Sequence, residues 1–112
     1  MLQYRYCLAL DLVNDEQLIK EYEAYHREVW PEILSSIREA GIDSMEIYRI
    51  GNRLFMIIEA SNPVDFSAKA KADTTNEKVQ EWETLMWKYQ QALPFAKPGE
   101  KWMMMDKIFE TV

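Results

Sequence analysis

The fold is decided by residues 44–60, which read Ser-Met-Glu-Ile-Tyr-Arg-Ile-Gly-Asn-Arg-Leu-Phe-Met-Ile-Ile-Glu-Ala. Residues 44–50 and 54–60 are both rich in β-forming residues, and the Gly-Asn-Arg between them permits the positive φ of a tight turn. The pattern predicts an antiparallel hairpin in the middle of the chain. Tyr48 lies in its first strand, where packing is the simplest interpretation of its role and contact with a ligand is the alternative.

A strand and a helix are predicted before the hairpin. Along residues 4–13 bulky side chains alternate with smaller or polar ones, which indicates a strand whose bulky face packs on helices; that face carries Tyr4, Tyr6, Leu8, Leu10 and Leu12. Asn14 is then a helix cap, and apolar residues recur at spacings of three and four up to Gly41, which is expected to end the helix. Pro31 lacks an N–H group and its ring crowds the carbonyl of Arg27, so this helix must bend or restart there.

The second half of the chain predicts two more helical segments and a final strand. Asn62 and Pro63 form a helix-start signal, with Asn as the cap and Pro in the first turn. A longer helix is predicted from Asn76 toward Leu93, where the following proline ends it. The last strand is expected over residues 101–109.

The complete order, strand, helix, strand, strand, helix, strand, is typical of a ferredoxin-like α+β sandwich with an antiparallel sheet and its helices on one face. A chain of 112 residues is expected to form one such domain over residues 1–112. The other face of the sheet would stay uncovered. Part of it is expected to be apolar, so that a homodimer or a ligand cavity must cover it; the residues assigned to it are Leu54, Met56, Met103 and Met105.

Composition argues against several classes of function. The net charge is −6 and the Lys and Arg residues form no basic run, which disfavours nucleic-acid binding. No apolar stretch approaches the roughly 18–20 residues of a membrane span, and a signal-peptide pattern is lacking, so we expect a cytoplasmic protein without membrane contact. With one cysteine, one histidine and three widely separated glycines, a metal cluster or a phosphate loop is not expected. Any chemistry should need no cofactor.

The candidate chemistry centres on the only histidine, His26. In a helix, Tyr22, His26 and Trp30 project from one face at intervals of four residues. With Tyr48 and Trp82 they offer what a sugar cavity needs: aromatic faces for stacking, hydrogen-bonding groups, and an imidazole that gives and takes protons near neutral pH. The alternative is that Tyr22 and Trp30 are core aromatics, with His26 a hydrogen-bonded neighbour at the edge of the core.

Residues 22–32, which follow the pattern Tyr-x-x-x-His-x-x-x-Trp-Pro-Glu, resemble the helix of the L-rhamnose mutarotase family. The resemblance extends over nearly the whole chain and includes the hairpin of Tyr48 and the run at residues 79–82. It implies an isomerase that interconverts the α and β anomers of a deoxyhexose by acid–base ring opening, without a cofactor. It also implies a dimeric ferredoxin-like α/β barrel in the cytoplasm.

The resemblance further implies roles for individual residues. The position of His26 is the proposed proton donor of the family, and the positions of Tyr22 and Trp82 contact the sugar. Two positions depart from the rhamnose enzymes: Met45 stands where they have a second sugar-contacting aromatic residue, and Glu83 where they have a second tryptophan. The sugar is therefore open between L-rhamnose and L-fucose, on which a related branch of the family acts.

Other interpretations use the same fold differently. Small dimeric ferredoxin-like proteins include cofactor-free monooxygenases that oxidise aromatic polyketides, and a non-catalytic sugar-binding module is a further alternative. A histidine beside Tyr22 favours catalysis, because a pure binder gains little from a group that titrates near neutral pH. A shifted alignment would place Trp87 instead of Trp82 in the stacking role.

Overall fold

Five strands form one antiparallel sheet: β1 (Tyr4–Leu12), β2 (Ser44–Ile50), β3 (Arg53–Ala60), β4 (Gln90–Gln91) and β5 (Met103–Met104). The structure is a computed structural model that describes residues 4–111. The strand order is β2-β3-β1-β4, with β5 also paired to β1, which confirms the ferredoxin-like α+β fold. The predicted hairpin is confirmed, and Gly51 adopts a φ of 58° in its turn.

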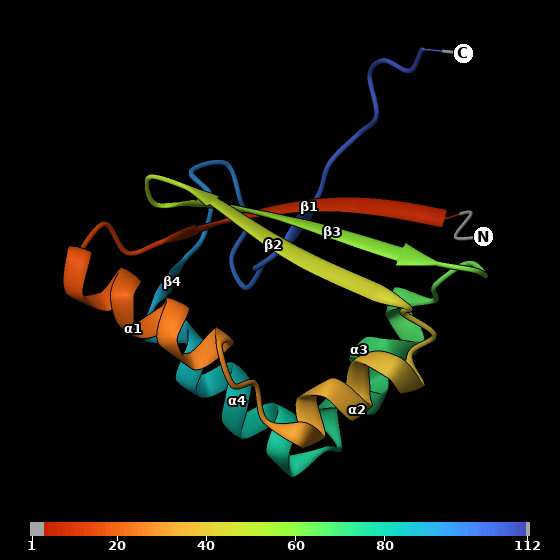
Figure 1. Cartoon of the computed structure of the whole chain (residues 1–112), viewed down its shortest axis with the longest axis horizontal. Coiled ribbons are helices and arrows are strands. Elements are labelled where there is room, and N and C mark those ends of the chain that lie inside the picture. The colour runs from red at the N-terminus through yellow and green to blue at the C-terminus, as the bar shows by residue number, and fades with distance from the viewer. Residues whose placement is uncertain (1–3, 112) are drawn as a thin grey trace.

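Four helices cover one face of this sheet (Figure 1): α1 (Glu16–His26), α2 (Pro31–Glu39), α3 (Phe66–Thr74) and α4 (Glu77–Trp87). Figure 1 shows β1, β2 and β3 as one layer above the helices, and the C-terminal segment rising on the opposite side of the sheet. We call the sheet face toward the helices the inner face and the opposite one the outer face. No helix within residues 4–111 combines the length and the hydropathy that crossing a membrane requires.

The break predicted at Pro31 is present, and it separates α1 from α2. Helix α1 ends at His26, and Pro31 restarts the helix in its first turn after Trp30 as the N-cap. Trp30 therefore lies outside α1, and the predicted ridge of three rings reduces to Tyr22 and His26. The N-cap of α1 is Asp15 rather than the predicted Asn14, because the Asp15 carboxylate accepts from the N–H of Leu18.

Three further boundaries differ from the prediction, two of them where a tertiary contact competes with the local signal. Helix α3 begins after Asp65, which caps it, whereas the N–H of Val64 donates to the hydroxyl of Tyr6 at 3.1 Å. Helix α4 begins where predicted, with Asn76 as its N-cap, but ends at Trp87, since residues 90–91 pair with β1 as a strand instead of continuing the helix. The last strand is two residues long rather than nine.

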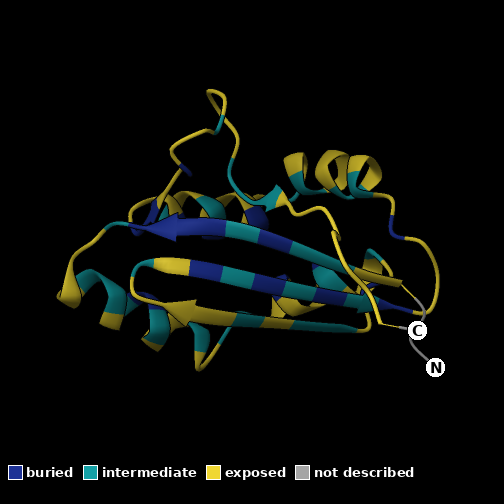
Figure 2. Ribbon diagram, turned by 90° about the horizontal axis from the view of Figure 1, so that it is seen from above, coloured by how far each residue is buried: buried dark blue, intermediate teal, exposed yellow. Residues whose placement is uncertain are grey.

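The register of the sheet corrects the predicted outer face. Leu54 and Met56 pair with Leu10 and Leu8 of β1 and point to the inner face, where they are 2% and 8% exposed. The β3 residues that point to the outer face are Phe55 and Ile57. They pair with Ala9 and Cys7 of β1. Figure 2 shows this outer side, on which buried and less buried positions alternate along the strands.

The core between sheet and helices consists of two adjoining clusters. One cluster gathers around Tyr22, Trp82 and Met86. The other lies around Met56 and Ile58, near the start of β2 and the end of β3. Trp102, from the segment before β5, packs against both clusters. The junction of the two clusters is where the main pocket opens.

Candidate active site

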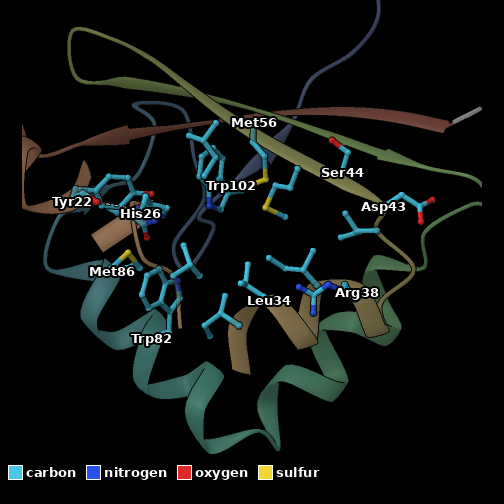
Figure 3. Close-up of a pocket in the computed structure, with 17 residues that line it drawn as sticks. Tyr22, His26, Leu34, Arg38, Asp43, Ser44, Met56, Trp82, Met86 and Trp102 are labelled. Atoms are coloured by element: carbon cyan, nitrogen blue, oxygen red, sulfur yellow. Dashed lines mark hydrogen bonds between the residues drawn. The ribbon is translucent and has the colours of Figure 1, made fainter. Parts of the chain in front are cut away.

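The main pocket lies between the inner face of the sheet and the helices. Its volume is about 470 Å³, within the roughly 300–1,000 Å³ usual for small-molecule sites. Figure 3 shows Tyr22, His26, Trp82 and Met86 at one end and Arg38, Asp43 and Ser44 at the other, with Met56 and Trp102 between. The pocket is thus aromatic at one end and polar at the other.

His26, the last residue of α1, is the only imidazole in the chain and lies at the aromatic end. Its Nδ1 is 2.8 Å from the backbone carbonyl oxygen of Tyr22. Because a carbonyl oxygen only accepts hydrogen bonds, Nδ1 carries the proton and donates it, which leaves the lone pair on Nε2. The neutral ring therefore offers a base at Nε2.

The surroundings of His26 keep this ring neutral. The ring is half-buried between Tyr22, at a centroid distance of 4.4 Å, and Trp82, whose ring meets it edge-on at 5.5 Å. Burial lowers the pKa of His26 below 6.5, and the hydrogen bond to the Tyr22 carbonyl offsets part of this effect. At neutral pH the imidazole is therefore a proton acceptor, which becomes a donor once it has taken a proton.

Tyr22 lies one helical turn before His26 and is almost fully buried. Its hydroxyl accepts a hydrogen bond from Nε2 of Gln90 at 3.3 Å. Burial raises the pKa of the phenol, and the bond from Gln90 offsets part of this shift, so Tyr22 stays protonated at neutral pH and keeps an O–H to donate. Tyr22 thus contributes a hydrogen-bonding group and not a charge.

The structure brings three of the five predicted site residues together. Trp82, on α4, lines the pocket with Tyr22 and His26. Trp30 packs against Trp82 with a centroid distance of 5.1 Å and lines a separate surface groove instead of the main pocket. Tyr48 pairs with Phe55 on the outer face and is 53% exposed, so the sheet separates it from the pocket.

Trp87, the alternative stacking residue, does not reach the pocket either. It is exposed at the end of α4, where the ammonium group of Lys101 lies 4.8 Å from its ring centroid. Met45, by contrast, points to the inner face and lines the pocket. The position at which the resemblance implied an aromatic residue in the rhamnose enzymes is thus a pocket position here, and it is occupied by methionine.

Sequence reasoning missed five polar or aromatic residues of the pocket: Arg38, Asp43 and Ser44 at the polar end, and Gln90 and Trp102. Gln90 was assigned to a helix, although Trp87 already falls off the apolar stripe of that helix and signals its end. Trp102 enters through the loop before β5, and a tryptophan among methionines after a glycine-containing loop was the available signal. Over residues 4–111, no three His, Cys, Asp or Glu side chains gather as metal ligands would.

Comparison with known proteins identifies the family. The family model described as L-rhamnose mutarotase matches residues 5–111. The L-fucose mutarotase of Xanthomonas campestris pv. campestris is 46% identical over 111 residues, which cover 97% of this chain and 89% of that protein. The crystal structure of the L-rhamnose mutarotase of Formosa agariphila matches 98% of this chain and 100% of its own, with a TM-score of 0.70 and 20% identity.

A dimeric ferredoxin-like protein from an uncultured marine organism shares the fold at a TM-score of 0.54 and 13% identity, over 100% of this chain and 95% of that one. The structural neighbours bear on the fold, whereas the family match and the 46% identical relative bear on the activity. The single histidine, a buried tyrosine and a tryptophan meet in one pocket. The chain belongs to the L-rhamnose mutarotase family, whose members are isomerases that interconvert sugar anomers.

Proposed function

We propose that this protein is a cofactor-independent mutarotase for a deoxyhexose, L-rhamnose or L-fucose, and that His26 carries the proton transfers. The observation that supports this most is the geometry of His26, whose Nδ1 is engaged by the Tyr22 carbonyl, which leaves the lone pair on Nε2, and whose ring lines the pocket. The family match favours L-rhamnose and the 46% identical relative favours L-fucose, so both sugars are candidates.

The proposed mechanism needs one imidazole. Nε2 of His26 takes the proton of the anomeric hydroxyl, and the bond between C1 and the ring oxygen breaks with its electron pair going to the ring oxygen. The imidazolium then returns the proton from Nε2 to the ring oxygen of the sugar. Both sugar oxygens are bonded to C1, so the same nitrogen can reach either of them. The open aldehyde rotates about its bond to C2, and reversal of the steps closes the other anomer.

The lining of the pocket suits a deoxyhexose better than a hexose. Trp82 offers an aromatic surface to the apolar side of a pyranose, and much of the remaining wall is aliphatic or thioether; it includes Ile33, Ile42, Met45, Met56 and Met86. The methyl group of L-rhamnose or L-fucose fits such a wall, whereas the hydroxymethyl group of D-glucose, placed against the same wall, would leave a hydroxyl without a partner.

Magnetisation exchange between anomer signals in NMR tests this function. L-rhamnose, L-fucose and D-glucose are compared at one pH and buffer concentration, with and without the protein. We expect acceleration of anomer exchange for at least one deoxyhexose and less for D-glucose. Exchange at the buffer rate with both deoxyhexoses would refute the proposal, and so would equal or greater acceleration with D-glucose. Sugar binding without acceleration would identify a non-catalytic binding module.

We also propose that the protein works as a homodimer joined through the outer face. Phe55 and Ile57 are half-buried there without helical cover, and beyond β5 the side chains of Ile108 and Phe109 are 95% and 77% exposed. A second copy would cover such apolar surface, and the fold neighbour from the marine organism is described as dimeric. Sedimentation at micromolar concentration should give twice 13.3 kDa. Cytoplasmic location and the lack of a nucleic-acid partner stay predictions from composition.

A further inference from the structure

Gln90 is a buried polar residue of the pocket that the proposed proton transfers do not use. It is 6% exposed and lines the pocket beside Tyr22. Within residues 4–111, Gln90 Oε1 is the one buried side-chain oxygen or nitrogen that has no hydrogen-bond partner. Buried amide oxygens are nearly always paired, so a lone acceptor in a binding pocket calls for a physical explanation.

The position of Gln90 is fixed by the strand pairing of β4 and by the neighbouring Tyr89. Gln90 pairs with Leu12 of β1, and the buried Tyr89 before it donates its hydroxyl proton to Glu21 Oε1 at 2.9 Å. Gln91, the next residue, is exposed. Because side chains alternate along a strand, Gln90 is directed inward, toward the pocket that it lines.

Gln90 and Tyr22 together present a matched pair of hydrogen-bonding groups. Gln90 Nε2 donates to the Tyr22 hydroxyl, which accepts this bond, and in the described part of the chain no acceptor takes the phenol's own proton. The pair thus offers one acceptor, Gln90 Oε1, and one donor, the Tyr22 O–H. A sugar hydroxyl both donates and accepts and can satisfy the two at once, whereas a methyl or methylene group satisfies neither.

We infer that Gln90 is a specificity-determining residue, whose Oε1 accepts a hydrogen bond from one ring hydroxyl of the sugar while Tyr22 donates to the oxygen of that hydroxyl. A pocket built to pair a hydroxyl rejects the analogue that lacks it, because the buried amide is then left unpaired. L-rhamnose and L-fucose differ in the configuration of their ring hydroxyls at C2 and C4, so a fixed acceptor in the pocket bears on the choice between them. The inference rests on the proposed function for the class of ligand.

The first test compares Gln90→Met with Gln91→Met, the same change at the exposed neighbouring position. Methionine keeps the unbranched shape of glutamine and removes its acceptor and donor. Calorimetric titration with L-fucose and L-rhamnose gives Kd for the wild type and both variants, and anomer exchange is measured on the same samples. We expect Gln90→Met to weaken binding of the preferred sugar by about tenfold or more, and Gln91→Met to leave it within about twofold.

The second test leaves the protein unchanged and so does not depend on the folding of a variant. Monodeoxy and monodeoxyfluoro analogues of the better-bound sugar are titrated into the wild type. At one ring position both analogues should bind about tenfold or more weaker than the parent, because neither hydrogen nor fluorine can donate to Gln90 Oε1. In Gln90→Met the penalty at that position should shrink to the part that the Tyr22 O–H contributes, because the acceptor Gln90 Oε1 is gone.

The outcomes separate this inference from the proposed function. Wild-type affinity in Gln90→Met would overturn the inference, and so would the lack of any ring position at which both analogues lose affinity. Failure of the wild type to bind either sugar would overturn it as well. If the expected pattern of binding holds while anomer exchange stays at the buffer rate, the inference stands and the proposed mutarotase function is wrong.

Discussion

The two faces of the sheet carry similar apolar side chains but meet different surroundings. The run from Leu54 to Ile58 supplies both faces: Leu54, Met56 and Ile58 are buried against the helices, whereas Phe55 and Ile57 point outward and stay half-buried. The inner face encloses a pocket with an imidazole, a phenol and an amide. The outer face is uncovered in one chain and suits a second copy.

The polar groups of the two faces differ in the same way. On the inner side His26 Nδ1 is held by the Tyr22 carbonyl and Gln90 Nε2 by the Tyr22 hydroxyl, while Gln90 Oε1 has no partner. On the outer side Arg5 pairs with Glu59 at 2.8 Å, an exposed ion pair of a kind that contributes about 0–1 kcal/mol to stability. The inner groups line a pocket, whereas the outer pair links β1 to β3, which agrees with the proposals that the inner face carries the chemistry and the outer face forms the dimer.

The largest expected effect on the inner side is that of His26→Ala. The exchange rate should fall about 10²- to 10⁴-fold, the usual contribution of a general acid–base group, while sugar binding should suffer less because Trp82 remains. Arg27→Ala, at the exposed neighbouring residue, is the control. Melting curves correct each rate for the folded fraction. Wild-type exchange in the folded fraction of His26→Ala would mean that the histidine is a packing residue.

On the outer side, Ile57→Lys should break the proposed dimer. Burying an unpaired ammonium group at the interface costs about 2–5 kcal/mol, so the dissociation constant should rise by about 30-fold or more. Thr84→Lys, on an exposed position of α4, should leave the dimer intact. Sedimentation equilibrium measures both. A wild-type monomer of normal stability would remove the proposed explanation for the apolar outer face.

A comparison of two tyrosines across the sheet has a smaller expected effect. Tyr22→Phe removes the hydroxyl that accepts from Gln90, and kcat/KM for anomer exchange should fall about tenfold because a substrate-facing donor is lost. Tyr48→Phe changes the outer face and should alter kcat/KM by less than about twofold. Equal losses in the two variants would show that the outer face takes part in the site and would undo the distinction between the faces.

Sequence patterns predicted the parts of the fold that depend on neighbouring residues. The alternation in β1 assigned its bulky face to the inner side, and the spacing of four residues placed Tyr22 beside His26. The faces of β3 were misassigned because Leu54 to Ile58 is continuously apolar, and a run without alternation contains no signal for which face each residue takes. The register that decides it comes from pairing with β1.

The missed site residues share a long-range cause. Gln90 reaches the pocket through the pairing of β4 with β1, and Trp102 through packing between two core clusters, and neither contact has a local sequence signature. Trp30 was misplaced because the chain leaves the helix after His26, before the restart at Pro31. Local periodicity therefore predicted that Tyr22 and His26 lie together, but not which residues complete the cavity.

The titration of His26 is the most direct test of its role, and the single histidine makes its NMR signals unambiguous. Burial lowers the pKa of His26 below 6.5, so the imidazole should stay neutral at neutral pH and protonate only as the pH falls further. Since neutral Nε2 is the proposed base, kcat/KM for anomer exchange should fall on the acid side with the same midpoint as the NMR titration of the free protein. Coincident midpoints below 6.5 are the predicted result. An NMR midpoint at or above 6.5, or an exchange rate that does not follow the titration of His26, would contradict the account.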